Sequence, residues 1–178
     1  MSCAAELFAE RGYHPTSVAD IVNELGVGKG VFYWYFTSKE ELFIEILRDA
    51  QYALRRRQQA DIGDEPDPIR RIEKGLYASM RWLAENRQVF NLFQFAATEA
   101  AFAPTLRRGN DVATADAMRH VKDAINDGKV RDGDPLLLTQ AIVGVTNQLA
   151  RRCIYDRNDL PDEVAAVAVQ FCLHGLMG

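Results

Sequence analysis

The sequence predicts an all-α protein, with three short N-terminal helices followed by a larger domain of longer helices. Apolar residues recur three and four positions apart along most of its 178 residues, which is the period of a helix with one buried face. Capping residues, glycine and proline interrupt this period at helix-length intervals. Near the N-terminus, two short helical segments are joined by a tight turn that contains glycine, the arrangement of a helix-turn-helix unit.

The first two helices are predicted from their stop and start signals. A short amphipathic segment is expected to end at Gly12. Thr16 and Ser17 then offer an N-cap for a helix over residues 18–25, which Gly26 ends. The apolar residues of this helix have the i, i+3, i+4, i+7 spacing of one face: Val18, Ile21, Val22 and Leu25.

Residues 28–36, with the sequence GKGVFYWYF, permit two interpretations. Six apolar or aromatic residues in a row have the propensity of a strand, yet no neighbouring segment alternates like a partner strand. As a helix, the run separates into two faces, with Phe32 and Phe36 expected to pack inward beside Val27. We predict a helix whose outer face carries five residues: Lys29, Gly30, Tyr33, Trp34 and Thr37.

A long helix is predicted from Ser38 to about Gln59, because Ser38 and Glu41 have the spacing of a capping box. Its expected buried residues are Leu42, Phe43, Ile46, Leu47, Ala50 and Leu54. Residues 60–68 form the clearest linker. Further helices are expected over residues 69–86, 89–101, 113–128 and 135–155, and from Pro161 onward.

The composition is that of an ordinary globular protein and excludes several functional classes. Apolar residues make up 48% and charged residues 26%, and no apolar run reaches the length of a membrane span. We therefore expect a cytoplasmic protein without a membrane partner. Three widely spaced cysteines and three isolated histidines provide neither a disulfide framework nor a metal site. No nucleophile or acid–base motif is present, so we predict neither an enzyme nor a bound cofactor.

The last two predicted helices are apolar on more than one side, and such helices are usually buried on more than one side. We predict a two-fold symmetric homodimer built from these helices. The alternative is an apolar core completed within one chain. The predicted dimerisation residues are Ala141, Val145, Val164, Val167, Ala168, Phe171 and Cys172.

Residues 4–43 combine an LFxxxGY segment, a Thr-Ser helix start, an LGV turn, a KGxFYxYF helix and an SKEEL cap. In this combination the segment closely resembles the DNA-binding domain of TetR-family transcriptional regulators, over about a quarter of the chain. The other helices fit that family's ligand-binding and dimerisation domain in number and layout. The resemblance implies a helix-turn-helix DNA-binding domain over residues 1–43, with its first helix truncated, and a ligand-binding and dimerisation domain over residues 44–178.

The function implied by the resemblance is that of a homodimeric repressor, bound to double-stranded operator DNA and released by a small hydrophobic ligand. Lysine neutralises phosphate, a tyrosine hydroxyl positions the helix on the backbone, and glycine permits close approach. The positions that match DNA contacts in the family are Ser17, Lys29, Gly30, Tyr33, Trp34, Tyr35 and Lys39.

Several features depart from the family pattern at the DNA-binding positions. Gly28 and Val31 replace frequent hydroxyl residues, and Ala19 replaces a base-reading arginine of some relatives. The chain also begins inside the family's first helix, and residues 1–60 carry seven basic and eight acidic side chains. The alternative function is therefore a ligand-binding or interaction protein of the same fold, with weak or lost DNA binding.

The region between the linker and Pro135 is rich in aromatic residues. Aromatic side chains at helical spacing usually form a core, but a dense cluster also suits an apolar ligand pocket. The predicted ligand-binding residues are Tyr77, Trp82, Phe90, Phe93, Gln94, Glu99 and Phe102. The resemblance implies that ligand favours a state whose recognition helices no longer fit both half-sites.

Overall fold

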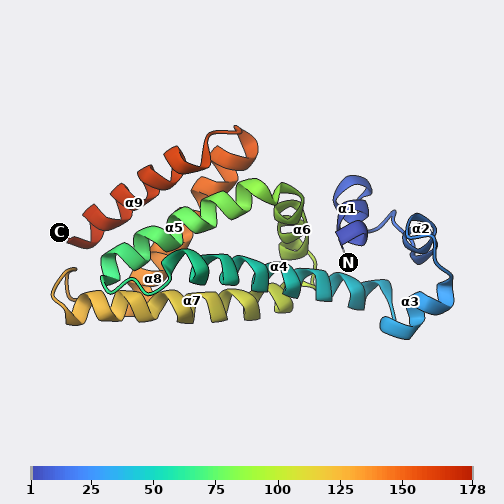
Figure 1. Cartoon of the computed structure of the whole chain (residues 1–178), viewed down its shortest axis with the longest axis horizontal. Coiled ribbons are helices and arrows are strands. Elements are labelled where there is room, and N and C mark those ends of the chain that lie inside the picture. Colours follow the sequence, from blue (N-terminus) through green and yellow to red (C-terminus); the bar gives the residue numbers. More distant parts are fainter. Residues whose placement is uncertain (1, 178) are drawn as a thin grey trace. The chain divides into compact units, whose positions relative to one another are not determined.

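The protein is described by a computed structural model that covers residues 2–177, and the regular secondary structure of this part is entirely helical (Figure 1). This confirms the predicted fold class. The helices are α1 (Ser2–Arg11), α2 (Val18–Glu24), α3 (Lys29–Tyr35), α4 (Lys39–Ile62), α5 (Pro68–Glu85), α6 (Arg87–Thr98), α7 (Ala103–Asn126), α8 (Pro135–Leu149), the π-helix η1 (Ala150–Asp156) and α9 (Pro161–Met177). The predicted helix over residues 135–155 is thus α8 continued by a π-helical segment.

The chain forms two compact units, and the longest helices contribute to both. The N-terminal unit contains the chain up to Tyr52 together with Asn86–Gly109, and the C-terminal unit contains Ala53–Glu85 together with the chain from Asn110. The units do not coincide with the predicted domains 1–43 and 44–178. The reason is that α6 and the first part of α7 complete the core around the first three helices.

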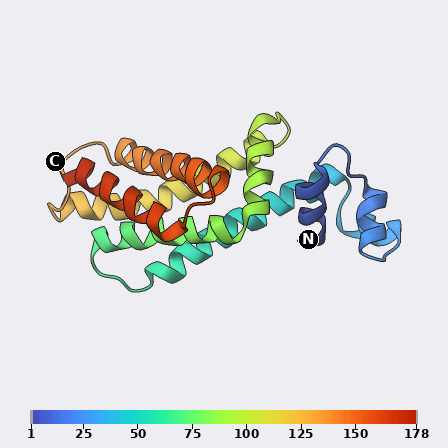
Figure 2. The same cartoon turned by 90° about the horizontal axis from the view of Figure 1, so that it is seen from above.

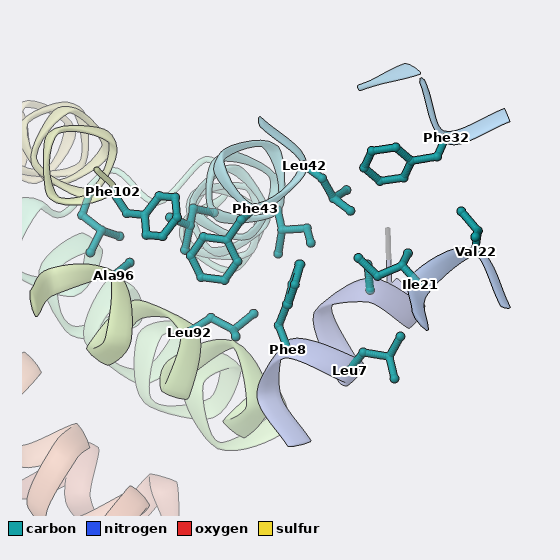
Figure 3. Close-up of a cluster of buried hydrophobic side chains, with 14 residues drawn as sticks. Leu7, Phe8, Ile21, Val22, Phe32, Leu42, Phe43, Leu92, Ala96 and Phe102 are labelled. Carbon is teal, nitrogen blue, oxygen red and sulfur yellow. The ribbon is translucent and has the colours of Figure 1, made fainter. Parts of the chain in front are cut away.

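The core of the N-terminal unit is built around Phe43 of α4, whose side chain is completely buried. Its ring lies 5.3 Å from the ring of Phe8 in α1 and 4.5 Å from that of Phe102, which precedes α7. Figure 3 shows these rings together with Leu92 and Ala96 of α6. Because α1, α4 and α6 share this core, the two short helices α2 and α3 rest on a rigid base.

Local sequence signals fix the end of α1 and both ends of α2. Gly12 and Gly26 adopt positive φ angles of 86° and 64°, which glycine accepts without strain. Ser17 is the N-cap of α2, and its backbone N–H donates to Asp20 Oδ2 at 2.8 Å while Asp20 N–H donates to Ser17 Oγ at 3.2 Å. This reciprocal pair forms a capping box. Thr16, the other predicted cap, instead donates its hydroxyl to the carbonyl of Gly12 at 2.7 Å.

The predicted start of α4 at Ser38 is confirmed, but the Glu41 side chain has a different partner from the one that a capping box requires. Ser38 Oγ accepts the backbone N–H of Glu41 at 3.1 Å. The Glu41 carboxylate accepts two hydrogen bonds from Thr37 rather than from Ser38, both at 2.6 Å. These hydrogen bonds lower the pKa of Glu41. They hold the corner between α3 and α4 in one conformation.

The C-terminal unit packs α9 against α5 and α8 (Figures 1 and 2). Its core combines Leu76 of α5, Val121 of α7, Ile142 of α8 and Cys172 of α9. Arg81 joins α5 to the start of α9 by two hydrogen bonds to the carboxylate of Asp162, at 2.6 and 3.0 Å. None of the helices described in this structure is long and apolar enough to cross a membrane.

Candidate nucleic-acid interface and ligand cavity

Helix α3 presents three consecutive aromatic side chains to solvent. The exposed fractions are 56% for Tyr33, 84% for Trp34 and 71% for Tyr35, whereas Phe32 is 6% exposed. The inward position predicted for Phe32 is therefore confirmed. Val27 is 38% exposed, so its predicted inward position is wrong, because it lies in the turn before α3 rather than on the helix.

An exposed Trp and two exposed Tyr leave a large apolar surface on a helix that is only seven residues long. Exposed large aromatic side chains gathered on one short helix are typical of an interaction site. Tyr and Trp suit a surface that meets polar groups, because each combines a flat apolar ring with a hydrogen-bond donor. Lys29 adds an exposed positive charge at the start of the same helix.

Neither Gly28, the N-cap residue of α3, nor Gly30 is required by close packing within the chain. A Cβ atom added to Gly28 or Gly30 would have no neighbouring atom within 4 Å, and neither residue has a positive φ. Glycine inside a helix costs roughly 1 kcal/mol of stability relative to alanine. Packing within the chain therefore does not account for glycine at position 30.

The family resemblance implies that Lys39 contacts phosphate, but its ammonium group is engaged within the protein. Nζ donates to the carbonyl oxygens of Tyr13 and Thr16 at 2.8 Å each and to that of His14 at 3.3 Å. It also lies 4.3 Å from the centre of the Tyr13 ring. Partial burial lowers the pKa of Lys39. An ammonium group has three N–H donors, and all three have acceptors in the loop between α1 and α2.

We expect Lys39→Met to destabilise the N-terminal unit by about 1–3 kcal/mol, because three carbonyl oxygens lose a charged donor while the aliphatic stem is kept. Thermal unfolding followed by circular dichroism measures this effect. Lys122, an exposed residue of α7 in the C-terminal unit, provides the matched control. Equal melting temperatures for Lys39→Met and Lys122→Met would contradict a structural role for Lys39.

Ser17 is exposed, but its hydroxyl is likewise used locally. Oγ donates to Asp20 Oδ2 at 2.5 Å, and hydrogen bonds from Ser17 lower the pKa of the Asp20 carboxyl group. The described structure thus leaves Lys29, Gly30, Tyr33, Trp34 and Tyr35 as the predicted DNA-binding residues exposed together on α3.

The predicted ligand-binding residues are divided between the two units. Phe93 packs against the core of the N-terminal unit and Phe102 is part of it. Glu99 lies 3.5 Å from His14 Nε2, and Gln94 is exposed. Phe90 is buried in the N-terminal unit, whereas Tyr77 and Trp82 belong to the C-terminal unit.

A cavity of about 380 Å³ lies instead within the C-terminal unit, between the second half of α4 and helices α5, α7 and α8. None of the seven predicted ligand-binding residues lines it. Its apolar lining comes from all four helices: Leu54, Ile72, Leu76, Leu83, Val121 and Ile142. This volume is within the range of small-molecule sites.

Charged side chains line another part of the same cavity. Arg55 donates to Asp116 Oδ2 through Nε at 2.8 Å and through Nη2 at 2.5 Å, and Arg119 pairs with the other oxygen of the same carboxylate. Arg71 Nη2 donates to Asp123 Oδ2 at 2.9 Å.

Two buried nitrogen atoms in the cavity wall lack a hydrogen-bond partner in the described part of the chain: Arg71 Nε and His120 Nδ1. Burial lowers the pKa of His120, and the charge of Arg71 lowers it further. Both effects favour the neutral imidazole. No sequence motif marks Arg71 or His120, because each occupies an ordinary position in an amphipathic helix.

The predicted dimerisation residues divide into two groups. Val164, Ala168 and Cys172 are buried within the chain, and Val145 packs against the same core, so these four contribute to the core of the C-terminal unit. The remaining three are exposed. We define the α8–α9 apolar surface as the exposed residues Leu137 and Ala141 of α8 with Val167 and Phe171 of α9, of which Leu137, Val167 and Phe171 are 67%, 58% and 66% exposed.

Comparisons with known proteins agree with this architecture. Residues 1–46 match the family model described as bacterial regulatory proteins, tetR family. The transcriptional repressor KstR2 of Mycobacterium tuberculosis strain H37Rv is 31% identical over 104 residues, which are 58% of this chain and 52% of that protein. The chain thus spans about half the length, or less, of the first curated relatives it matches.

Solved structures resemble nearly the whole chain. The TetR family transcriptional regulator PfmR from Thermus thermophilus has a TM-score of 0.80 at 26% identity, over 97% of this chain and 95% of that one. The fatty acid degradation regulator FadR from Bacillus halodurans has a TM-score of 0.88, over 98% and 93% of the two chains. At 17% identity, the second likeness concerns the fold alone.

Proposed function

We propose that this chain is a homodimeric repressor of the TetR family, which binds operator DNA and is released by a small ligand. The observation that carries this proposal is the outer face of α3. Lys29, Gly30 and Tyr33 lie on it exposed to solvent, beside Trp34. The family relation supports docking of this helix in the major groove.

Each group on α3 has a distinct role in the proposed complex. Lys29 neutralises a phosphate and displaces a counterion. The Tyr33 hydroxyl donates to a phosphate oxygen and fixes the position of the helix without reading sequence. Gly30 lets the backbone approach the DNA, which agrees with the open space around it. Trp34 and Tyr35 provide apolar contacts at the base edges or the sugars.

Two half-sites are proposed to be bound at once by a dimer formed through the α8–α9 apolar surface. A two-fold interface is self-complementary, so each residue of this surface is used twice. The exposed Val167 and Phe171 support this assignment, because large apolar side chains gain stability when a second subunit covers them.

The proposed ligand site is the cavity of the C-terminal unit. Helix α4 contributes Phe43 to the core of the N-terminal unit and Leu54 and Arg55 to the cavity wall. A ligand that prefers one position of α4 would thereby shift the population of DNA-binding states. Such a ligand acts only through its differential affinity for those states. KstR2 is named a repressor, which supports the direction of the proposed regulation.

Lys29→Ala and Tyr33→Phe are expected to weaken operator binding with little effect on folding. Tyr33→Phe removes one hydroxyl from an exposed side chain, so the free energy of unfolding should change by no more than about 0.5 kcal/mol. Its loss of affinity should be about ten-fold and equal at any sequence. Lys29→Ala should also reduce the slope of log affinity against log salt by about one unit in each protomer.

A salt titration of operator affinity, with a duplex from the region upstream of the gene, measures both effects. Lys122→Ala removes an exposed lysine from the C-terminal unit and serves as the charge-matched control. If Lys29→Ala and Tyr33→Phe bind like the parent protein at every salt concentration, α3 is not the DNA-contacting helix. The exposed aromatic residues would then belong to a protein interface, as the alternative function requires.

A further inference from the structure

We propose that the cavity of the C-terminal unit binds an amphiphile with one negatively charged headgroup, and that Arg71 and His120 bind this headgroup. The inference rests on the proposed function in that it names the chemical class of the effector. The binding chemistry itself depends only on residues of the C-terminal unit, which line the whole cavity.

The apolar part of the ligand is inferred from the size and lining of the cavity. Leu54, Leu76 and Ile142 lie on three different helices and all face it. A volume of about 380 Å³ corresponds to about a dozen water molecules, each with a share of about 30 Å³ in the liquid. A chain of about ten carbon atoms with a small headgroup has a comparable size.

The charge of the headgroup follows from the ion pairs in the wall. Arg55 and Arg119 share the single carboxylate of Asp116, so the three side chains carry one net positive charge, with the Arg119 side chain 69% exposed. Arg71 is balanced by Asp123. A cationic ligand would therefore find no unpaired carboxylate among these residues. An anionic ligand balances the excess charge and is the class that the wall favours.

The position of the headgroup follows from the two unpaired nitrogen atoms. Arg71 Nε carries a hydrogen that lacks an acceptor in the described chain, although Nη2 of the same group bonds to Asp123. His120 Nδ1 is buried and also lacks a partner there. Buried donors are satisfied in nearly all proteins. A carboxylate has two acceptor oxygens, one for Arg71 Nε–H and one for an Nδ1–H tautomer of His120.

Three ligands with the same ten-carbon tail test the charge of the headgroup: decanoate, decan-1-ol and decyltrimethylammonium. Isothermal titration of the full chain, below the concentrations at which micelles form, gives the three affinities. We expect decanoate to bind at least about ten-fold more tightly than the other two, because a charged hydrogen bond and the excess positive charge favour it. Equal or weaker binding of decanoate, or no binding at all, would overturn the proposal.

Two substitutions on α5 test the position of the headgroup. Arg71→Gln is expected to weaken decanoate binding by about ten- to a hundred-fold and to leave decan-1-ol unchanged. Arg81→Gln is the matched control, because Arg81 lies on the same helix and pairs with Asp162 but does not line the cavity. The assignment would be overturned if Arg71→Gln and Arg81→Gln lost decanoate affinity equally. It would also be overturned if Arg71→Gln lost affinity for decanoate and decan-1-ol equally.

A further variant keeps the test valid if Arg71→Gln does not fold. Asp123→Asn removes the carboxylate that holds Arg71 Nη2, while the guanidinium group remains. Decanoate should then bind at least as tightly as in the parent protein, and about two- to ten-fold more tightly if the released guanidinium turns to the ligand. Weaker binding of decanoate in Asp123→Asn would count against the role of Arg71.

The same ligands separate this inference from the proposed function. Decanoate affinity is measured without DNA, and a gel shift then follows operator binding as decanoate is added. Tight decanoate binding without release of DNA would overturn ligand-controlled repression and support the headgroup assignment. Specific operator binding by a chain that does not bind decanoate would overturn the headgroup assignment alone.

Discussion

A chain that carries both Val167→Asp and Phe171→Asp is expected to be monomeric at concentrations where the parent protein is a dimer. A two-fold interface contains each residue twice, so four large apolar side chains lose their burial. Burial of each contributes about 1.5–3 kcal/mol. The dissociation constant should therefore rise by at least about a thousand-fold. Light scattering coupled to size-exclusion chromatography measures the change.

The fold of the variant should be kept, because both substituted residues are exposed within one chain. The inward side of α9 is formed by Val164, Ala168 and Cys172, which the variant leaves intact. Val112→Asp is the matched control, because Val112 is a 44% exposed valine on α7, outside the α8–α9 apolar surface. A double variant that remains a dimer would remove this surface from the proposed interface.

The dimer variant is also expected to lose cooperative operator binding. A helix-turn-helix dimer contacts two half-sites about one helical turn apart. A monomer retains the contacts of one α3 helix, and linkage to the second half-site is lost. The α3 variants differ from this dimer variant, because Lys29→Ala and Tyr33→Phe should weaken operator binding while leaving the dimer unchanged.

The features predictable from the sequence are those that depend on neighbouring residues. The boundaries of α2 follow from the Ser17–Asp20 capping box and from Gly26. The inward position of Phe32 follows from its helical spacing. In each case the deciding contact lies within about four residues, so a local pattern contains the information.

The features that the sequence did not predict depend on contacts between distant segments. Lys39 contacts the carbonyl of Tyr13, 26 positions earlier. Helical periodicity predicts that α9 has two apolar sides, yet only packing against α5 and α8 shows that Val164 is inside and Val167 outside. The cavity likewise needs Arg71 of α5 and His120 of α7, which have no common sequence motif.

The aromatic residues between positions 77 and 102 are another case in which contacts between distant segments decide the structure. Their density suggested a ligand pocket, but Phe93 and Phe102 complete the core of the N-terminal unit. Tyr13, on the loop before α2, lies 5.0 Å from the ring of Phe102. The helix-turn-helix unit therefore depends on α6 and α7, which a sequence boundary at residue 43 separates from it.

Phe43→Ala is expected to give the largest loss of stability in the N-terminal unit. The side chain is fully buried, and its ring lies 4.9 Å from that of Tyr13 as well as close to Phe8 and Phe102. Truncation of a buried phenylalanine to alanine costs about 3–5 kcal/mol, because the surrounding groups cannot fill the cavity that forms. Chemical unfolding followed by circular dichroism measures the loss.

Trp34→Ala is the matched control, because it removes a larger aromatic side chain from the same unit. Trp34 is 84% exposed, so its removal should change the free energy of unfolding by no more than about 0.5 kcal/mol. Both variants should lose operator binding, for different reasons. Phe43→Ala should lose it because the base that supports α3 unfolds, and Trp34→Ala because a contact surface is removed from a folded unit.

If both variants have the stability of the parent protein, Phe43 is not the centre of this core. If Trp34→Ala is also unfolded, the exposed aromatic residues stabilise the fold, and their assignment to DNA binding fails.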